Sequence, residues 1–121
     1  MINLNQINHL KRLMGENRFN EALSLIENLC NENYYSPYLW NVRARLEMLQ
    51  GGSDGDPFGN AEKYLRIAFE INPDDLEVLE ELAHFYDVLV PDREKSVRFA
   101  TMVSEKVGLL QRDMRKILED S

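Results

Sequence analysis

Cysteine and histidine, which often act as nucleophiles, bases or metal ligands, are scarce in this 121-residue chain, which has one cysteine and two histidines. His9, Cys30 and His84 lie far apart in the sequence, and neither a cysteine nor a carboxylate stands at metal-ligand spacing beside His9. Nucleophilic catalysis needs a nucleophile next to a base, and metal catalysis needs a cluster of ligands. Because the sequence offers neither pattern, we expect no enzyme activity, no cofactor and no bound metal.

The acidic segment between Gly51 and Asn60 has some features of a calcium-binding loop. An EF-hand loop that began at Asp54 would need an oxygen ligand where Phe58 stands and a carboxylate where Leu65 stands. Cation binding is therefore not expected there. The glycines and acidic residues between Gly51 and Asn60 instead favour a surface loop that leads into a helix.

Composition limits the classes of partner. The chain is 44% hydrophobic and 29% charged, as expected for a soluble globular domain. Its 14 Lys and Arg against 21 Asp and Glu leave a net charge of −7, which repels phosphate backbones and anionic lipids. We therefore expect no nucleic acid and no membrane partner. A single cysteine and no apolar leader pattern favour a cytoplasmic location.

Hydrophobic periodicity and capping residues predict an all-α protein. Ser36 with Pro37, Asp56 with Pro57, and Asp74 with Glu77 three residues later are typical of helix starts. Pro73 and Pro91 are expected to end the preceding helices. The predicted helices cover residues near 3–15, 18–32, 37–50, 57–72, 75–89 and 93–107.

The predicted helices form three successive pairs, each a helix, a short polar turn and a second helix. Small residues near the start of each second helix, Ala22, Ala61 and Ser96, are separated by 39 and 35 residues. A period of about 34 residues, with insertions in the connecting loops, is typical of helical-hairpin repeats.

On these residues the chain resembles the tetratricopeptide repeat family. The third repeat carries the family's spacing on its first helix through Leu79, Leu82, Ala83 and Tyr86. The second repeat matches through Trp40, Ala44, Gly51, Ala61, Leu65, Ala68 and Pro73. It departs at Arg43 and Glu47, so the packing of that helix is predicted to rotate toward Leu39, Val42, Leu46 and Leu49. The first repeat is degenerate and rests on Leu10, Leu13, Phe19, Ala22, Ile26 and Leu29.

The resemblance implies a single domain over residues 1–121, a right-handed superhelix of three antiparallel helix hairpins with a concave groove. The repeats cover about 3–36, 37–75 and 76–108. After Gly108 we expect a seventh helix, about 109–120, with one apolar face formed by Leu110, Met114, Ile117 and Leu118. Such a helix is expected to cap the open end of the stack; the alternative is a partner-binding or dimerising helix.

The family's inner helices line the groove, and this predicts a binding surface. Its candidate residues are Leu4, Ile7, Lys11 and Met14 in the first repeat, Tyr38, Asn41, Arg45 and Met48 in the second, and Glu77, Glu80, Glu81, His84 and Asp87 in the third. The acidic end would attract and orient a partner peptide or protein that carries basic residues. Trp40 is expected to pack between hairpins.

The expected function is non-catalytic protein–protein interaction by a monomer or weak homodimer. Two other roles fit the same sequence features: an immunity protein that neutralises a basic toxin or nuclease, and a secretion-type chaperone that holds an extended peptide.

Overall fold

A computed structural model describes residues 3–50 and 55–120. Over these two ranges the chain forms six α-helices and one π-helical turn, with no strand. The predicted all-α class is confirmed. Residues 51–54, which include Asp54 of the predicted loop, lie outside the described residues. The chain divides into two compact units, Met1–Pro73 and Asp74–Ser121.

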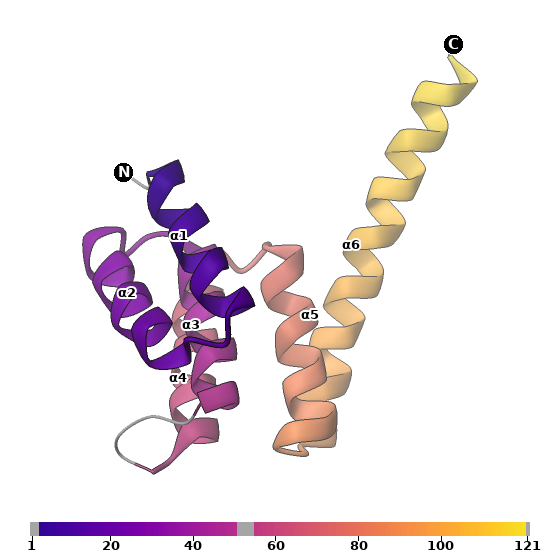
Figure 1. Cartoon of the computed structure of the whole chain (residues 1–121). Helices are drawn as coiled ribbons and strands as arrows, with labels where there is room; N and C mark the ends of the chain where they lie inside the picture. The colour runs from indigo at the N-terminus through magenta and orange to yellow at the C-terminus, as the bar shows by residue number, and fades with distance from the viewer. Residues whose placement is uncertain (1–2, 51–54, 121) are drawn as a thin grey trace. The chain divides into compact units, whose positions relative to one another are not determined.

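The first unit contains two helical hairpins (Figure 1). Helix α1 (Leu4–Gly15) pairs with α2 (Phe19–Glu32), and α3 (Pro37–Gln50) pairs with α4 (Pro57–Ile71). Helix α2 also packs against α3, which joins the hairpins through one apolar core. Its residues follow the helical period and are each at most 2% exposed: Leu10, Leu13, Ala22, Ile26, Leu29, Leu39, Leu46, Ala61, Leu65 and Ala68.

Two polar residues on α3, Arg43 and Glu47, pack against side chains of α3 and α4. The guanidinium of Arg43 lies 4.3 Å from the ring centre of Tyr64 and 5.4 Å from that of Trp40, so it packs as a cation over two aromatic faces. The Glu47 carboxylate is buried and accepts a hydrogen bond from the Asn60 side-chain amide at 3.0 Å. Of the residues toward which the helix was predicted to rotate, Leu39, Val42 and Leu46 are buried, whereas Leu49 is 63% exposed. Trp40, Ala44 and Glu47 are buried as well, so the buried face of α3 is wide and the rotation stays a prediction.

The second unit is a hairpin of α5 (Leu76–His84) and α6 (Arg93–Glu119), joined through the π-helical turn η1 (Phe85–Leu89). The predicted helix over 75–89 is therefore α5 followed by η1. The N–H groups of Val90 and Asp92 donate to the carbonyls of Phe85 and Tyr86, at 2.9 and 2.8 Å. Pro91 has no N–H to continue the helix. The core of this hairpin comprises Val78, Leu79, Leu82, Phe85, Tyr86 and Phe99.

The start of α5 differs from the prediction by one residue. Asp75, not Asp74, caps the helix by accepting a hydrogen bond from the Val78 N–H at 3.2 Å. The Asp74 carboxylate lies 3.5 Å from the Lys106 ammonium on α6. The two adjacent aspartates at the start of α5 therefore have different roles: Asp75 caps the helix, and Asp74 forms an ion pair with α6.

The prediction of a separate seventh helix is wrong. Helix α6 runs for 27 residues, from Arg93 to Glu119, and passes through Gly108 without a break (Figure 1). A glycine ends a helix when it adopts a left-handed conformation, and Gly108 is not among the described residues with positive φ. Inside a helix, glycine costs only about 1 kcal/mol relative to alanine, which the good helix formers on both sides of it offset.

Candidate protein-binding surfaces

The predicted binding residues fall into both units. In the first unit Lys11 is exposed, Met14, Arg45 and Met48 are half-buried, and the Tyr38 side chain is 38% exposed. In the second unit the predicted acidic residues lie on α5 and η1. The groove that would join the two sets stays a prediction.

Asn41 is a correction to the predicted surface. Its side chain is 1% exposed, and its Oδ1 atom has no hydrogen-bond partner among the described residues. A partner that docks on the surface does not reach such a side chain. The resemblance placed Asn41 on the side of its helix that lines the groove, but the wide buried face of α3 includes its position as well as those of Leu39 and Trp40.

Acidic side chains share one face of α5. Glu77, Glu80 and His84 follow one another at spacings of three and four residues and are all exposed, as is Asp87 in η1. Glu81 is half-buried. This face carries negative charge into solvent and would attract cationic groups of a partner at long range.

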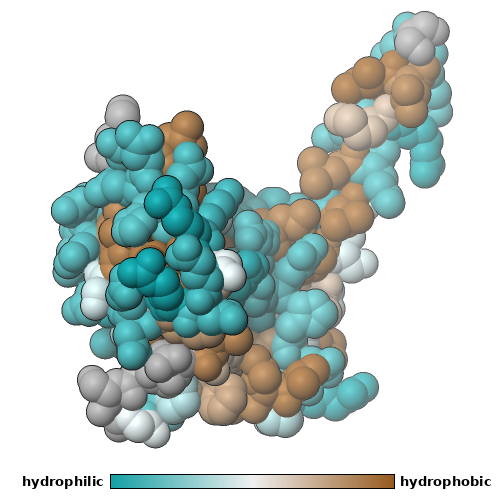
Figure 2. Space-filling model, in the orientation of Figure 1, coloured by the Kyte–Doolittle hydropathy of each residue, from teal (hydrophilic) through white to brown (hydrophobic). Residues whose placement is uncertain are grey.

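The distal part of α6, residues 108–119, exposes a row of large apolar side chains. Leu110, Met114, Ile117 and Leu118 are 48, 53, 61 and 73% exposed, and we call these four residues the α6 stripe. Figure 2 marks apolar surface in brown along this part of the helix, which continues beyond the end of α5 in Figure 1. The segment therefore does not cover the apolar core of its own hairpin, which corrects its predicted capping role within that unit.

The α6 stripe continues the face with which α6 packs on α5. The buried residues of α6 are Ser96 and Phe99, and Met114 and Ile117 repeat their spacing further along the same helix. An α-helix makes one turn in about 3.6 residues, so Met114 lies about five whole turns beyond Ser96, and Ile117 the same distance beyond Phe99. Whole turns return a side chain to the same side of the helix. The first half of this face is covered by α5, and the second half is exposed.

Charges of opposite sign border the α6 stripe. At about 100° per residue, Asp113 and Asp120 lie on the flank beside Ile117, whereas Arg115 lies on the flank beside Leu118. Asp113, Arg115 and Asp120 are all exposed. Arg112 and Glu119 project from the opposite side of the helix and are exposed as well.

An aromatic cluster at the α2–α3 turn was not identified from the sequence. Trp40 is 5% exposed, so it is buried as expected, and its indole N–H donates to the Tyr34 carbonyl at 2.7 Å. The Tyr34 ring stands edge-to-face with those of Trp40 and Tyr35, at 5.4 and 5.2 Å between ring centres. Tyr35 is 83% exposed. The adjacent residues Tyr34 and Tyr35, shortly before Pro37, were the signal in the sequence for an aromatic cluster. The sequence of a turn does not show which of the two rings packs against Trp40.

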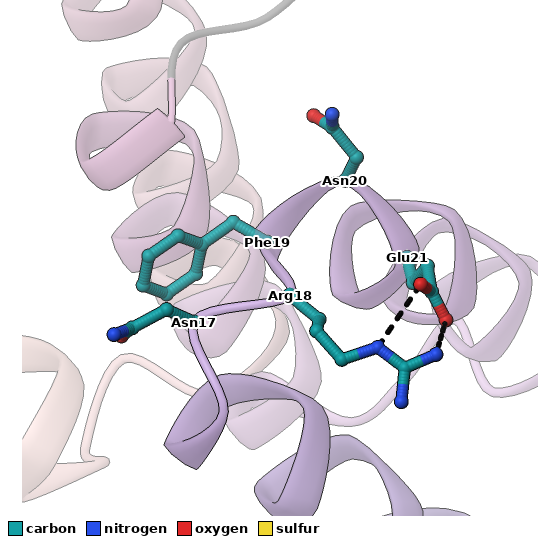
Figure 3. Close-up of a pocket in the computed structure, with 5 residues that line it drawn as sticks. All are labelled: Asn17, Arg18, Phe19, Asn20 and Glu21. Atoms are coloured by element: carbon teal, nitrogen blue, oxygen red, sulfur yellow. Dashed lines mark hydrogen bonds and ion pairs between the residues drawn. The ribbon is translucent and has the colours of Figure 1, made fainter.

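A shallow hollow of about 220 Å³ lies at the turn between α1 and α2 (Figure 3). Arg18 borders it and donates to both carboxylate oxygens of Glu21, at 3.0 and 2.6 Å. These hydrogen bonds raise the pKa of the Arg18 guanidinium. In Figure 3 the Asn20 side chain points away from this pair. The N–H groups of Arg18 that bond to Glu21 are not free to bind an anion. The hollow is therefore a poor anion-binding site.

Cys30 is packed inside the first unit. The residue is fully buried, and desolvation raises the pKa of its thiol to about 11, although the nearby Arg43 guanidinium opposes this shift. A thiol needs a lowered pKa and access to solvent to act as a nucleophile. Among the described residues, no group of three His, Cys, Asp or Glu side chains lies close enough together to hold a metal ion.

No protein-family model matches this chain, and no curated protein matches it either. No helix in the described part of the chain is both long and apolar enough to cross a membrane. Function is therefore inferred from the surfaces described above.

Proposed function

We propose that this chain is a non-catalytic protein-binding module. The α6 stripe carries the proposal: its four large apolar side chains on one face of a helix are each about half or more exposed. Covering them on binding would contribute about 1 kcal/mol each, since complete burial of such a side chain contributes roughly 1.5–3 kcal/mol. Apolar side chains of this size at the centre of an interface are typical binding anchors.

The partner segment carries basic residues. The exposed acidic face of α5 and the net charge of −7 support this part of the proposal. Such charges raise the rate of encounter and orient the partner more than they raise affinity. In the same proposal the hairpins stack as a right-handed tetratricopeptide-like superhelix, and the protein is cytoplasmic. The partner lies in the groove of this superhelix and contacts Lys11, Met14, Tyr38, Arg45 and Met48.

Affinity capture from the native cell lysate tests the proposal. The bait proteins are the wild type, Ile117→Glu, which places a charge in the α6 stripe, and Arg112→Glu as a matched control on the opposite side of the helix. Circular dichroism verifies that all three are equally helical. We expect Ile117→Glu to lose the captured protein and Arg112→Glu to retain it.

Salt separates the two kinds of contact. Contacts with the acidic face of α5 weaken when the salt concentration rises, whereas apolar contacts persist.

Equal capture by all three baits would contradict the proposal. A captured basic toxin or nuclease would indicate an immunity protein, and a captured secreted substrate would indicate a chaperone.

A further inference from the structure

The α6 stripe has room for one more helix. On the first half of α6, helix α5 covers the face that contains Ser96 and Phe99, and the same face returns at Met114 and Ile117. The ion pair between Asp74 and Lys106 marks where the cover from α5 ends. Residues 108–119 extend about 18 Å beyond this point, at about 1.5 Å per residue. A helix of about 12 residues would match the length of the exposed stripe.

The charges beside the stripe disfavour a second copy of this chain as that helix. If two copies paired in parallel, the first half of each α6 would need the space that α5 already fills. If they paired antiparallel, identical flanks would face each other, with Asp113 and Asp120 on one side and Arg115 on the other. Like charges that face each other across an interface are destabilising. Each copy also carries a net charge of −7.

We propose that the α6 stripe binds an amphipathic helix of a partner protein, and that this helix carries Lys or Arg on the flank that faces Asp113 and Asp120. Its apolar residues pack on Leu110, Met114 and Ile117, as α5 packs on the first half of α6. The proposal rests on the protein-binding function above and adds the form and charge of the partner. Docking of an apolar helix face on a groove or stripe is a recurrent mode of peptide recognition.

Two synthetic peptides test the proposal by fluorescence polarisation with the full-length chain. Both have leucines at helical spacing and a length of about 14 residues, enough to span the stripe as a helix. One carries lysines on a single flank, and the other carries glutamates at the same positions. The chain is used as wild type, as Asp113→Lys, as Glu119→Lys and as Ile117→Glu. Asp113→Lys and Glu119→Lys change the net charge equally, but only Asp113 borders the stripe.

We expect the lysine peptide to bind the wild type about tenfold more tightly than the glutamate peptide at low salt, about threefold for each flanking aspartate. Asp113→Lys reduces this preference about threefold or more. Glu119→Lys leaves it nearly unchanged, because position 119 lies on the other side of the helix. Ile117→Glu abolishes the binding of both peptides.

Several results would overturn the inference. The first is equal affinity for the two peptides, and the second is an equal effect of Asp113→Lys and Glu119→Lys. The third is a wild-type dimer in sedimentation that Ile117→Glu dissolves, since a second copy would then occupy the stripe. If neither peptide binds although lysate capture depends on Ile117, the protein-binding function stands and the amphipathic-helix partner is refuted. Peptide binding and lysate capture that both survive Ile117→Glu would refute both.

Discussion

Alkaline pH is expected to weaken the fold through one buried thiol. Burial raises the pKa of Cys30 from its ordinary value of 9.0 to about 11 in the folded chain. The unfolded chain releases this proton above pH 9, whereas the folded chain holds it to about pH 11. The pKa of the thiol is higher in the folded state than in the unfolded state. The protonated thiol of Cys30 therefore contributes its full share to stability below pH 9, and this share is lost between pH 9 and 11.

The size of this loss follows from the two pKa values. A difference of two pKa units corresponds to at most about 2.7 kcal/mol, of which about 1.8 kcal/mol is lost by pH 10.5 because the folded chain still holds most of its proton there. Urea denaturation followed by circular dichroism at pH 8 and pH 10.5 measures it, with Cys30→Ala as the matched control. Tyrosines and lysines titrate in both proteins, so the difference between wild type and variant isolates the thiol.

At pH 8 the wild type should be the more stable protein, because the variant loses a packed sulfur atom. This advantage should shrink by about 1–2 kcal/mol at pH 10.5. An advantage that stays constant between the two pH values would refute the reasoning. Native Cys30 should also react with a thiol reagent at pH 8 at least about 100-fold more slowly than the unfolded chain, because its thiolate fraction is lower.

Three further substitutions have expected effects on the free energy of unfolding, each measured by urea denaturation. Gly108→Ala should stabilise the protein by about 0.5–1 kcal/mol, because an added Cβ meets nothing within 4 Å in helix α6; destabilisation would mean that α6 breaks there. Trp40→Phe should cost about 1–2 kcal/mol, since it removes the hydrogen bond to the Tyr34 carbonyl; an unchanged midpoint would show that this bond contributes nothing. Asn41→Leu should be neutral or stabilising by about 1 kcal/mol, because the buried Oδ1 has no partner among the described residues, and a clear loss of stability would point to a hydrogen bond that Asn41 makes.

Helix positions were largely predictable because their signals are local. Pro37 and Pro57 begin α3 and α4, and Asp56 accepts a hydrogen bond from the Gly59 N–H, as the Asp-Pro pair suggested. Such signals work because a cap or a proline acts within one helical turn. Gly108 was misjudged for the same reason: whether a glycine ends a helix depends on its backbone conformation, which composition alone does not determine.

The candidate surfaces were predicted less well. Glu77, Glu80 and His84, which the resemblance placed on a binding surface, are exposed on one face of α5. The resemblance placed Asn41 in the groove, but Asn41 is buried on α3, as is Glu47. A polar residue can be buried where a partner such as Asn60 satisfies it, and that partner lies 13 residues further along the chain.

The amino-acid order by itself determined that this protein is helical, where most of its helices begin and end, and that an apolar face recurs along the last of them. Periodicity and capping are properties of neighbouring residues, so no tertiary contact is needed to detect them. The packing of one helix on another decided that α5 covers Ser96 and Phe99 but leaves Met114 and Ile117 exposed. The same apolar face is core in one half of α6 and surface in the other, because burial depends on how far the neighbouring helix extends.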